Sequence, residues 1–249
     1  MNLSSNEAKP KIFIAGLSWG RGEWIGPNVV HRGIEQYFID DGYQVFNVSK
    51  PRSTHTRVNQ LLDQALTEHY APGDLVFWIQ ADPIIDVIAD EVTGKLTNQK
   101  LTRLTDRLRQ AGSLDALIEE QQRVIYCELN NIAVNHNARI NCIGGTYNLN
   151  PIISEFTNLN LFVRSWINML VGQFTEYQHT DDVNFGVTHT WSLDNINTEQ
   201  LPTSTIDTIK QRIKNVIVFR EDIFHPDGLH PNRDGHKILY NHIIKELKL

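Results

Sequence analysis

The stretch Lys-Ile-Phe-Ile-Ala-Gly at residues 11–16 is a short apolar run that ends at a turn, and this pattern predicts a buried strand. Comparable runs occur at residues 43–48, 75–80, 140–143 and 216–219. Longer segments, whose apolar residues recur at helical spacing, separate these runs. Short strands that alternate with helices are typical of a parallel sheet covered by helices. The sequence therefore predicts an α/β fold.

The predicted helices are bounded by glycine, proline and asparagine turn signals. They are expected at residues 27–41, 56–69, 98–136 with a break at Gly112-Ser113, 166–174, 207–214 and 231–247. Most of residues 147–202 lacks a clear period and predicts an irregular surface insertion. No repeat or linker-like tract divides the chain, so we expect one domain over residues 1–249.

The composition argues against several classes of partner. The chain has 249 residues and a formal net charge of −6, and nothing in it favours a nucleic-acid surface. No apolar run approaches the roughly 18 residues that a membrane span needs, and no secretory signal is apparent near the N-terminus. We therefore expect synthesis in the cytoplasm and no membrane or nucleic-acid partner, and we leave the oligomeric state open. Cys127 and Cys142 lie in apolar contexts and are expected to be reduced core thiols.

Two segments carry the reactive side chains. Gly-Leu-Ser-Trp-Gly-Arg-Gly-Glu-Trp at residues 16–24 follows the first predicted strand, and His-Pro-Asp-Gly-Leu-His-Pro-Asn at residues 225–232 precedes the last predicted helix. In open α/β sheets, reactive groups gather at the carboxyl ends of the strands. A serine hydroxyl needs a neighbouring base to remove its proton, and the base needs a third group to hold its tautomer. We therefore expect Ser18, His230 and Asp227 to form a catalytic triad.

These segments resemble the Gly-Asp-Ser block and the C-terminal Asp-x-x-His block of the SGNH (GDSL-like) hydrolases. The order and position of the predicted elements resemble this family over most of the chain, but the residues themselves match only in these two blocks. The resemblance implies a three-layer α/β/α sandwich with a five-stranded parallel sheet in the order 2-1-3-4-5, and a serine esterase that uses no cofactor and no metal. The sequence Ser-Trp-Gly-Arg-Gly-Glu-Trp at residues 18–24 also resembles SGNH-like proteins of bacteriophages. This resemblance implies association with a phage particle.

The sequence departs from the family's pattern around the oxyanion hole. Leu17 stands where the family has an aspartate, and Arg52 stands where it has a glycine whose N–H joins the hole. The family's asparagine block reads Ile-Gln-Ala-Asp-Pro at residues 79–83 and contains no asparagine. We expect the backbone N–H groups of Ser18 and Arg52 to bind the oxyanion, joined by the side-chain amide of Gln80.

The surroundings of these blocks leave alternatives open. Tryptophans near a hydrolase serine stack on sugar rings in some sites and fill the core in others. The residues expected to contact substrate are Trp19, Arg21, Asp82 and His225. Imidazole and carboxylate in the second segment, together with His236, also suit zinc or iron, but their spacing repeats no known metal pattern, so we expect no metal.

Two functions from different classes follow from these observations. The first is a serine esterase that acts on a small acyl ester, such as a carbohydrate O-acetyl group. The second is a catalytically weak or inactive module of the same fold that binds a carbohydrate or a protein partner. The altered oxyanion hole keeps the second function open.

Overall fold

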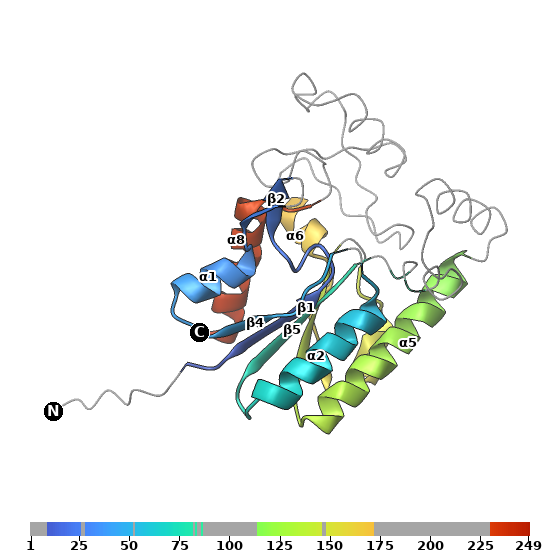
Figure 1. The fold of residues 1–249 in the computed structure, drawn as a ribbon. Coiled ribbons are helices and arrows are strands. Elements are labelled where there is room, and N and C mark those ends of the chain that lie inside the picture. The colour runs from blue at the N-terminus through green and yellow to red at the C-terminus, as the bar shows by residue number, and fades with distance from the viewer. Residues whose placement is uncertain are drawn as a thin grey trace, which may run out of the picture.

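A five-stranded parallel sheet forms the centre of the computed structural model, which describes residues 9–25, 28–51, 53–81, 83, 86, 114–145, 148–171 and 230–249. Its strands are β1 (Ile12–Gly16), β4 (Val45–Asn47), β5 (Leu75–Gln80), β6 (Ile140–Gly144) and β7 (Leu159–Val163). They lie in the order β4-β1-β5-β6-β7, and every neighbouring pair is parallel (Figure 1). Numbered along the chain, this is the predicted order 2-1-3-4-5, which is confirmed.

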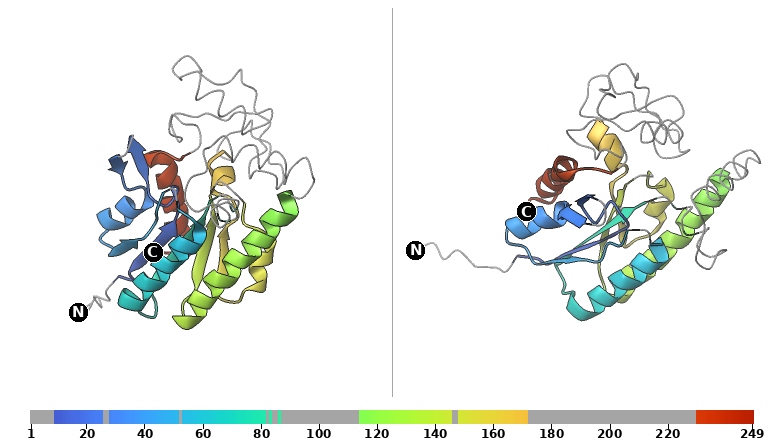
Figure 2. Two further views of the ribbon diagram at one scale, coloured as in Figure 1. Left: turned by 45° about the vertical axis from the view of Figure 1, so that its right-hand side comes forward. Right: turned by 45° about the horizontal axis from the view of Figure 1, so that its top comes forward.

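Helices cover both faces of this sheet and make the predicted three layers (Figure 2). One face carries α2 (His55–His69) and α5 (Leu114–Asn135); the other carries α1 (Ile34–Asp40), α6 (Trp166–Val171) and α8 (Arg233–Leu247). The other described elements are a 3₁₀ helix, η1 (Pro151–Glu155), and a hairpin of β2 (Glu23–Ile25) and β3 (Asn28–His31). No helix within the described ranges combines the length and the apolar composition that crossing a membrane requires.

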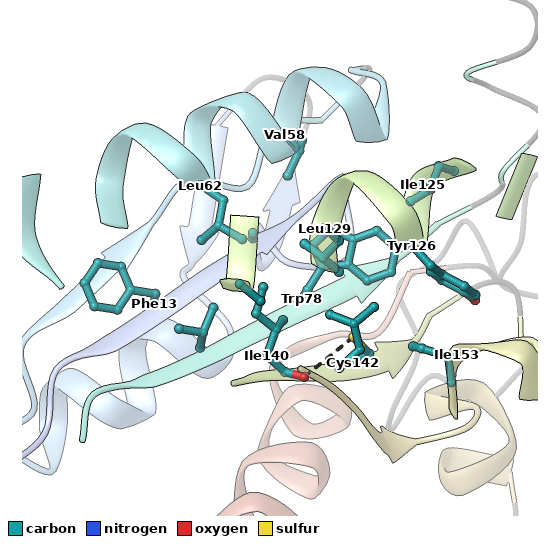
Figure 3. Packing of buried hydrophobic residues seen from close by; sticks show 14 of the residues in the cluster. Phe13, Val58, Leu62, Trp78, Ile125, Tyr126, Leu129, Ile140, Cys142 and Ile153 are labelled. Atoms are coloured by element: carbon teal, nitrogen blue, oxygen red, sulfur yellow. Dashed lines mark hydrogen bonds between the residues drawn. The ribbon is translucent and has the colours of Figure 1, made fainter. Parts of the chain in front are cut away.

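The core consists of two layers because successive side chains of a strand point to opposite faces. Phe13 and Ala15 of β1 pack toward α2 and α5, whereas Ile12 and Ile14 pack toward α1 and α8. Trp78 of β5 joins the first layer and is fully buried. Figure 3 shows this layer, in which α2 and α5 lie over β5 and β6. The alternation decides which side of the sheet each polar residue of a strand faces.

The helix predicted at residues 27–41 is wrong for its first half. Residues 28–31 form β3, which pairs antiparallel with β2, and the helix covers only Ile34–Asp40. The β-branched Val29 and Val30 favour a strand. Gly33 then adopts φ of 61°, a conformation that L side chains rarely take, and an added Cβ there would lie 2.5 Å from the His236 ring. Because of the hairpin and this glycine, the helix begins at Ile34 and not at residue 27.

The fifth strand of the sheet lies inside the segment that was predicted to be irregular. Residues 148–163 hold η1 and β7, so the prediction of an irregular insertion is wrong for that part, whereas α6 begins at the first residue of the helix predicted at residues 166–174. β7 is an edge strand in which only Leu159 and Val163 are buried, and such a strand has a weak apolar signal. The strand predicted at residues 216–219 lies outside the described residues. Both cysteines are free, but only Cys142 is a core thiol, because Cys127 is exposed on α5.

Candidate active site

The fold brings Ser18 and His230 together at one end of the sheet. Ser18 comes two residues after β1, and His230 lies just before α8. The two residues are 212 positions apart in the sequence, yet His230 Nε2 lies 2.9 Å from Ser18 Oγ. This distance is that of a hydrogen bond. A hydroxyl and an imidazole at this separation are able to exchange a proton.

A tight turn holds the serine. The backbone N–H of Arg21 donates to the carbonyl oxygen of Ser18 at 3.1 Å. Gly20 lies against the segment that follows β4, where an added Cβ would be 2.3 Å from the hydroxyl oxygen of Ser49. The turn therefore requires a residue without a side chain at position 20. Within the described residues, the N–H of Ser18 itself donates to no other backbone carbonyl.

Asn47 at the end of β4 ties this turn to its neighbours. Its side-chain amide donates to the carbonyl oxygen of Gly20 at 3.0 Å and to Glu35 Oε2 of α1 at 2.8 Å. Its amide oxygen accepts from the backbone N–H of Ser49 at 3.0 Å. One partly buried amide thus links β4, α1 and the serine turn, and it limits how far the serine can move.

The segment that carries His230 is held by the first turn of α8. The Asn232 side chain caps this helix by accepting two backbone N–H groups. Arg233 Nε then donates to Glu23 Oε2 of β2 at 3.0 Å, and the Tyr37 hydroxyl donates to the Arg233 carbonyl at 2.9 Å. Figure 1 shows the resulting neighbourhood of β2, α1 and α8. These contacts hold the start of α8, which directly follows His230, against β2 and α1, which follow Ser18 in the sequence.

A buried histidine lies on α8, six residues after His230. His236 is fully buried, and within the described residues neither of its ring nitrogens has a hydrogen-bond partner. Burial, together with the nearby His31 and His230, lowers the pKa of His236 to about 3. The ring packs edge to face on Trp166, with 4.9 Å between the ring centroids. His236 is therefore a neutral core residue.

Trp19 belongs to the same buried group and does not line a substrate cleft. Its side chain is 1% exposed and meets Trp166 edge to face at 5.2 Å. The predicted substrate contact at Trp19 is therefore wrong. The Trp19 side chain packs in the apolar cluster on the α1 and α8 side of the sheet.

Gln80 does not reach the oxyanion hole. It is fully buried, its amide donates to the Asn148 carbonyl at 3.2 Å, and its amide oxygen accepts from the Tyr126 hydroxyl at 2.7 Å. Tyr126 is on α5, so strand alternation turns Gln80 toward the α2 and α5 layer, as it does Trp78 two residues earlier. The prediction that Gln80 assists Ser18 is corrected: its hydrogen bonds are structural.

The other predicted site residues have mixed outcomes. Leu17, at the position of the family's aspartate, is buried in the core. Arg52, Asp82, His225 and Asp227 lie outside the described residues. No three histidine, cysteine, aspartate or glutamate side chains gather as metal ligands in the part of the chain that the structure describes.

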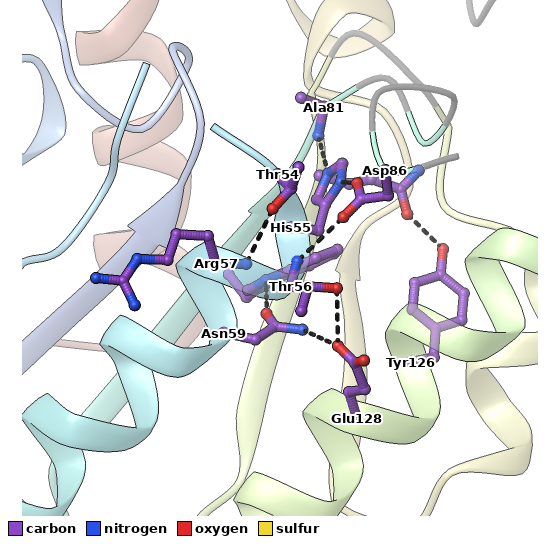
Figure 4. Close-up of polar contacts among 11 residues, drawn as sticks. Thr54, His55, Thr56, Arg57, Asn59, Ala81, Asp86, Tyr126 and Glu128 are labelled. Carbon is purple, nitrogen blue, oxygen red and sulfur yellow. Dashed lines mark hydrogen bonds and ion pairs between the residues drawn. The ribbon is translucent and has the colours of Figure 1, made fainter. Parts of the chain in front are cut away.

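A buried histidine–aspartate pair, which sequence reasoning missed, joins the end of β5 to α2. His55 Nδ1 lies 2.5 Å from Asp86 Oδ2, and His55 Nε2 accepts the backbone N–H of Ala81 at 3.0 Å (Figure 4). Asp86 also accepts the Thr56 N–H at 3.1 Å. Because Nε2 is occupied as an acceptor, His55 is not free to act as a general base. The pair is a buried clamp between the end of β5 and the start of α2.

The clamp keeps Asp86 ionised. Burial raises the pKa of Asp86, but the hydrogen bond and electrostatic attraction of the His55 ring and the backbone hydrogen bonds from Thr56 and His55 outweigh it, so the pKa lies below its usual value. No motif in the sequence marks this pair, since its members are 31 residues apart.

A hollow of about 530 Å³ opens beside the serine turn. Its walls come from the turn itself, from β3 and from the start of α1. The lining residues are Arg21, Val29, Val30, His31, Arg32, Glu35 and Gln36. Arg21, which was predicted to contact substrate, is therefore next to a space that a small molecule can enter.

Known proteins resemble this chain only distantly. No protein-family model matches the sequence, and no curated protein matches it either. Among solved structures, the psychrotrophic esterase EstA from Pseudoalteromonas sp., inhibited by monoethylphosphonate, is similar with a TM-score of 0.41 and 16% identity over 97% of this chain and 100% of that chain. A lipase/acylhydrolase from Enterococcus faecalis is similar with a TM-score of 0.38 and 15% identity over 96% of each chain. Likenesses this distant carry no argument about activity.

Proposed function

We propose that this protein is a serine esterase that hydrolyses small acyl esters, with carbohydrate O-acetyl groups as a substrate class. The 2.9 Å distance between Ser18 Oγ and His230 Nε2 carries the proposal. It supplies the two partners that nucleophilic catalysis by serine needs, a hydroxyl and a base within reach of its proton. Asp227 is the proposed third member, which holds the proton on the other ring nitrogen of His230.

The reaction runs in two halves. The Ser18 hydroxyl gives its proton to His230 as its oxygen attacks the ester carbonyl, and the tetrahedral intermediate collapses when His230 returns that proton to the departing alcohol. A water molecule then gives a proton to His230 and attacks the acyl–Ser18 ester. Collapse of the second intermediate releases the carboxylic acid and restores the serine hydroxyl.

Backbone donors bind the developing oxyanion in this proposal. The Ser18 N–H, which donates to no described backbone carbonyl, is the first donor, and the Arg52 N–H is the second. Gln80 is committed to Asn148 and Tyr126 and adds nothing. A missing oxyanion donor typically lowers the rate by ~10²–10³-fold. We therefore expect slow turnover compared with an esterase that has three donors.

The commitment of Gln80 also favours the second candidate function, a weakly active or inactive module that binds a carbohydrate or a protein partner. Labelling with a serine-directed fluorophosphonate separates the two. The esterase requires stoichiometric modification at Ser18, located by mass spectrometry, and loss of labelling in Ser18→Ala and in His230→Ala. Ser49→Ala is the matched control, because that serine has no base beside it in the described residues. Absence of labelling at Ser18 in the intact protein would favour the binding module.

A further inference from the structure

The hollow beside the serine turn has a charge opposite to that of the whole chain. Two arginines and one glutamate line it, which gives a formal charge of +1, whereas the chain carries −6. Glu35 is already engaged: Arg32 Nη1 lies 3.3 Å from its Oε1, and the Asn47 amide donates to its Oε2 at 2.8 Å. Within the described residues, the positive charge of this hollow that has no counter-charge is that of Arg21.

Arg21 is placed for a ligand. Arg21 is a partly buried residue, and its guanidinium has no ion pair or hydrogen bond with any residue in the described ranges. Its five N–H donors are therefore not used by the described part of the chain. Its backbone N–H, by contrast, is fixed to the Ser18 carbonyl at 3.1 Å. The backbone from which the Arg21 side chain extends is therefore held in place, three residues after the proposed nucleophile Ser18.

We propose that the hollow is a subsite for a carboxylate group on the ester substrate, which Arg21 binds through its guanidinium. The planar guanidinium matches a carboxylate in a bidentate geometry. This inference rests on the proposed esterase function and names its substrate class: esters whose acyl or alcohol part carries a carboxylate, such as acetylated acidic sugars.

The rim of the hollow fits the uncharged part of such a substrate. Val29 and Val30 of β3 are 41% and 45% exposed, so they offer apolar contact next to the charged wall. His31 contributes no fixed charge, because its Nδ1 accepts the Gly33 N–H at 3.0 Å and burial, with Arg233 nearby, lowers its pKa. The hollow, at about 530 Å³, has the size of a small-molecule site.

Matched ester pairs test the subsite. The substrates are 3- and 4-acetoxybenzoate, each compared with its own methyl ester, which has the same acetyl group but no charge. The measured quantity is kcat/KM for the acid divided by kcat/KM for the methyl ester. Intrinsic reactivity cancels when this ratio is compared between variants. We expect Arg21→Gln to lower the ratio by ~10-fold or more for at least one pair, because charge-assisted hydrogen bonds are lost.

Two further variants make the result specific. Arg21→Lys, which keeps the charge but not the planar fork, should lower the ratio by only ~3-fold. Arg57→Gln removes an exposed arginine from α2 on the other face of the sheet and should leave the ratio unchanged. Added salt should reduce the ratio of the unmodified protein toward that of Arg21→Gln, since salt screens the attraction. Equal ratios in the unmodified protein and Arg21→Gln for both pairs would overturn the subsite while leaving the esterase standing.

Binding to an inactive variant separates this inference from the proposed function. Calorimetric titration of Ser18→Ala with each acetoxybenzoate and its methyl ester requires no turnover. The subsite predicts that the acid binds more tightly than the methyl ester and that Ser18→Ala/Arg21→Gln loses this preference. If the unmodified protein hydrolyses no ester but the preference is found, the esterase fails and the anion site holds. If the preference is absent, the anion site is wrong.

Discussion

Acid should destabilise the folded protein through His236. Burial lowers the pKa of His236 to about 3, whereas a histidine in the unfolded chain titrates near ~6.5. Between these pH values the unfolded chain binds a proton that the folded chain excludes. The free energy of unfolding then falls by up to ~1.4 kcal/mol per pH unit. From pH 7 to pH 5 this linkage amounts to about 2 kcal/mol, and the loss levels off below the folded pKa because the folded protein then takes up the proton as well.

Urea unfolding followed by tryptophan fluorescence at pH 7, 6 and 5 measures this effect. His236→Leu has no group to protonate, so its stability relative to the unmodified protein should improve by about 2 kcal/mol as the pH falls from 7 to 5. His242→Leu, which changes a half-buried histidine on the same helix, keeps His236 and should show no such improvement. A constant difference between His236→Leu and the unmodified protein across this range would refute the reasoning.

Three other perturbations probe the site and its supports. Ser18→Ala and His230→Ala should each lower hydrolysis of an aryl acetate by several orders of magnitude, and the double variant should add little, because the residues act as a unit; independent, multiplying losses would contradict this. Gly20→Ala should lower activity by ~10-fold or more, since its Cβ would lie 2.3 Å from the Ser49 hydroxyl. Adding Ser49→Ala should restore part of that activity, and no rescue would show that the contact is not the cause. Asp86→Ala leaves two buried donors without an acceptor and should cost about 2–5 kcal/mol in urea unfolding, whereas a loss near zero would contradict the clamp.

Local pattern was enough for the main elements of the fold. The strand at residues 75–80 and the helix at residues 56–69 agree with the predicted bounds to within one residue, because each has one dominant apolar period. The proximity of Ser18 and His230 was predicted in the same way, because Ser18 follows the first strand and His230 precedes the last helix, at the carboxyl ends of parallel strands. Residue type and position along the chain carry this information.

Short or ambiguous segments were decided by contacts with distant parts of the chain. Residues 28–31 have a pattern compatible with a helix, but they pair with β2. Residues 159–163 bury only their two ends, so only pairing with β6 makes them a strand. In both cases the local preference is weak and the tertiary contacts are stronger.

The direction of each polar side chain was also beyond the sequence. Gln80 has the right type for an oxyanion donor, but strand alternation turns it to Tyr126, and Trp19 turns from the predicted cleft into the core. His55 and Asp86 meet only because the end of β5 and the start of α2 are neighbours. The sequence by itself predicted the layered fold and the approach of His230 to Ser18, because these depend on period and residue type. Tertiary structure alone decided which polar side chains turn into the core, because that depends on the face to which each backbone position turns.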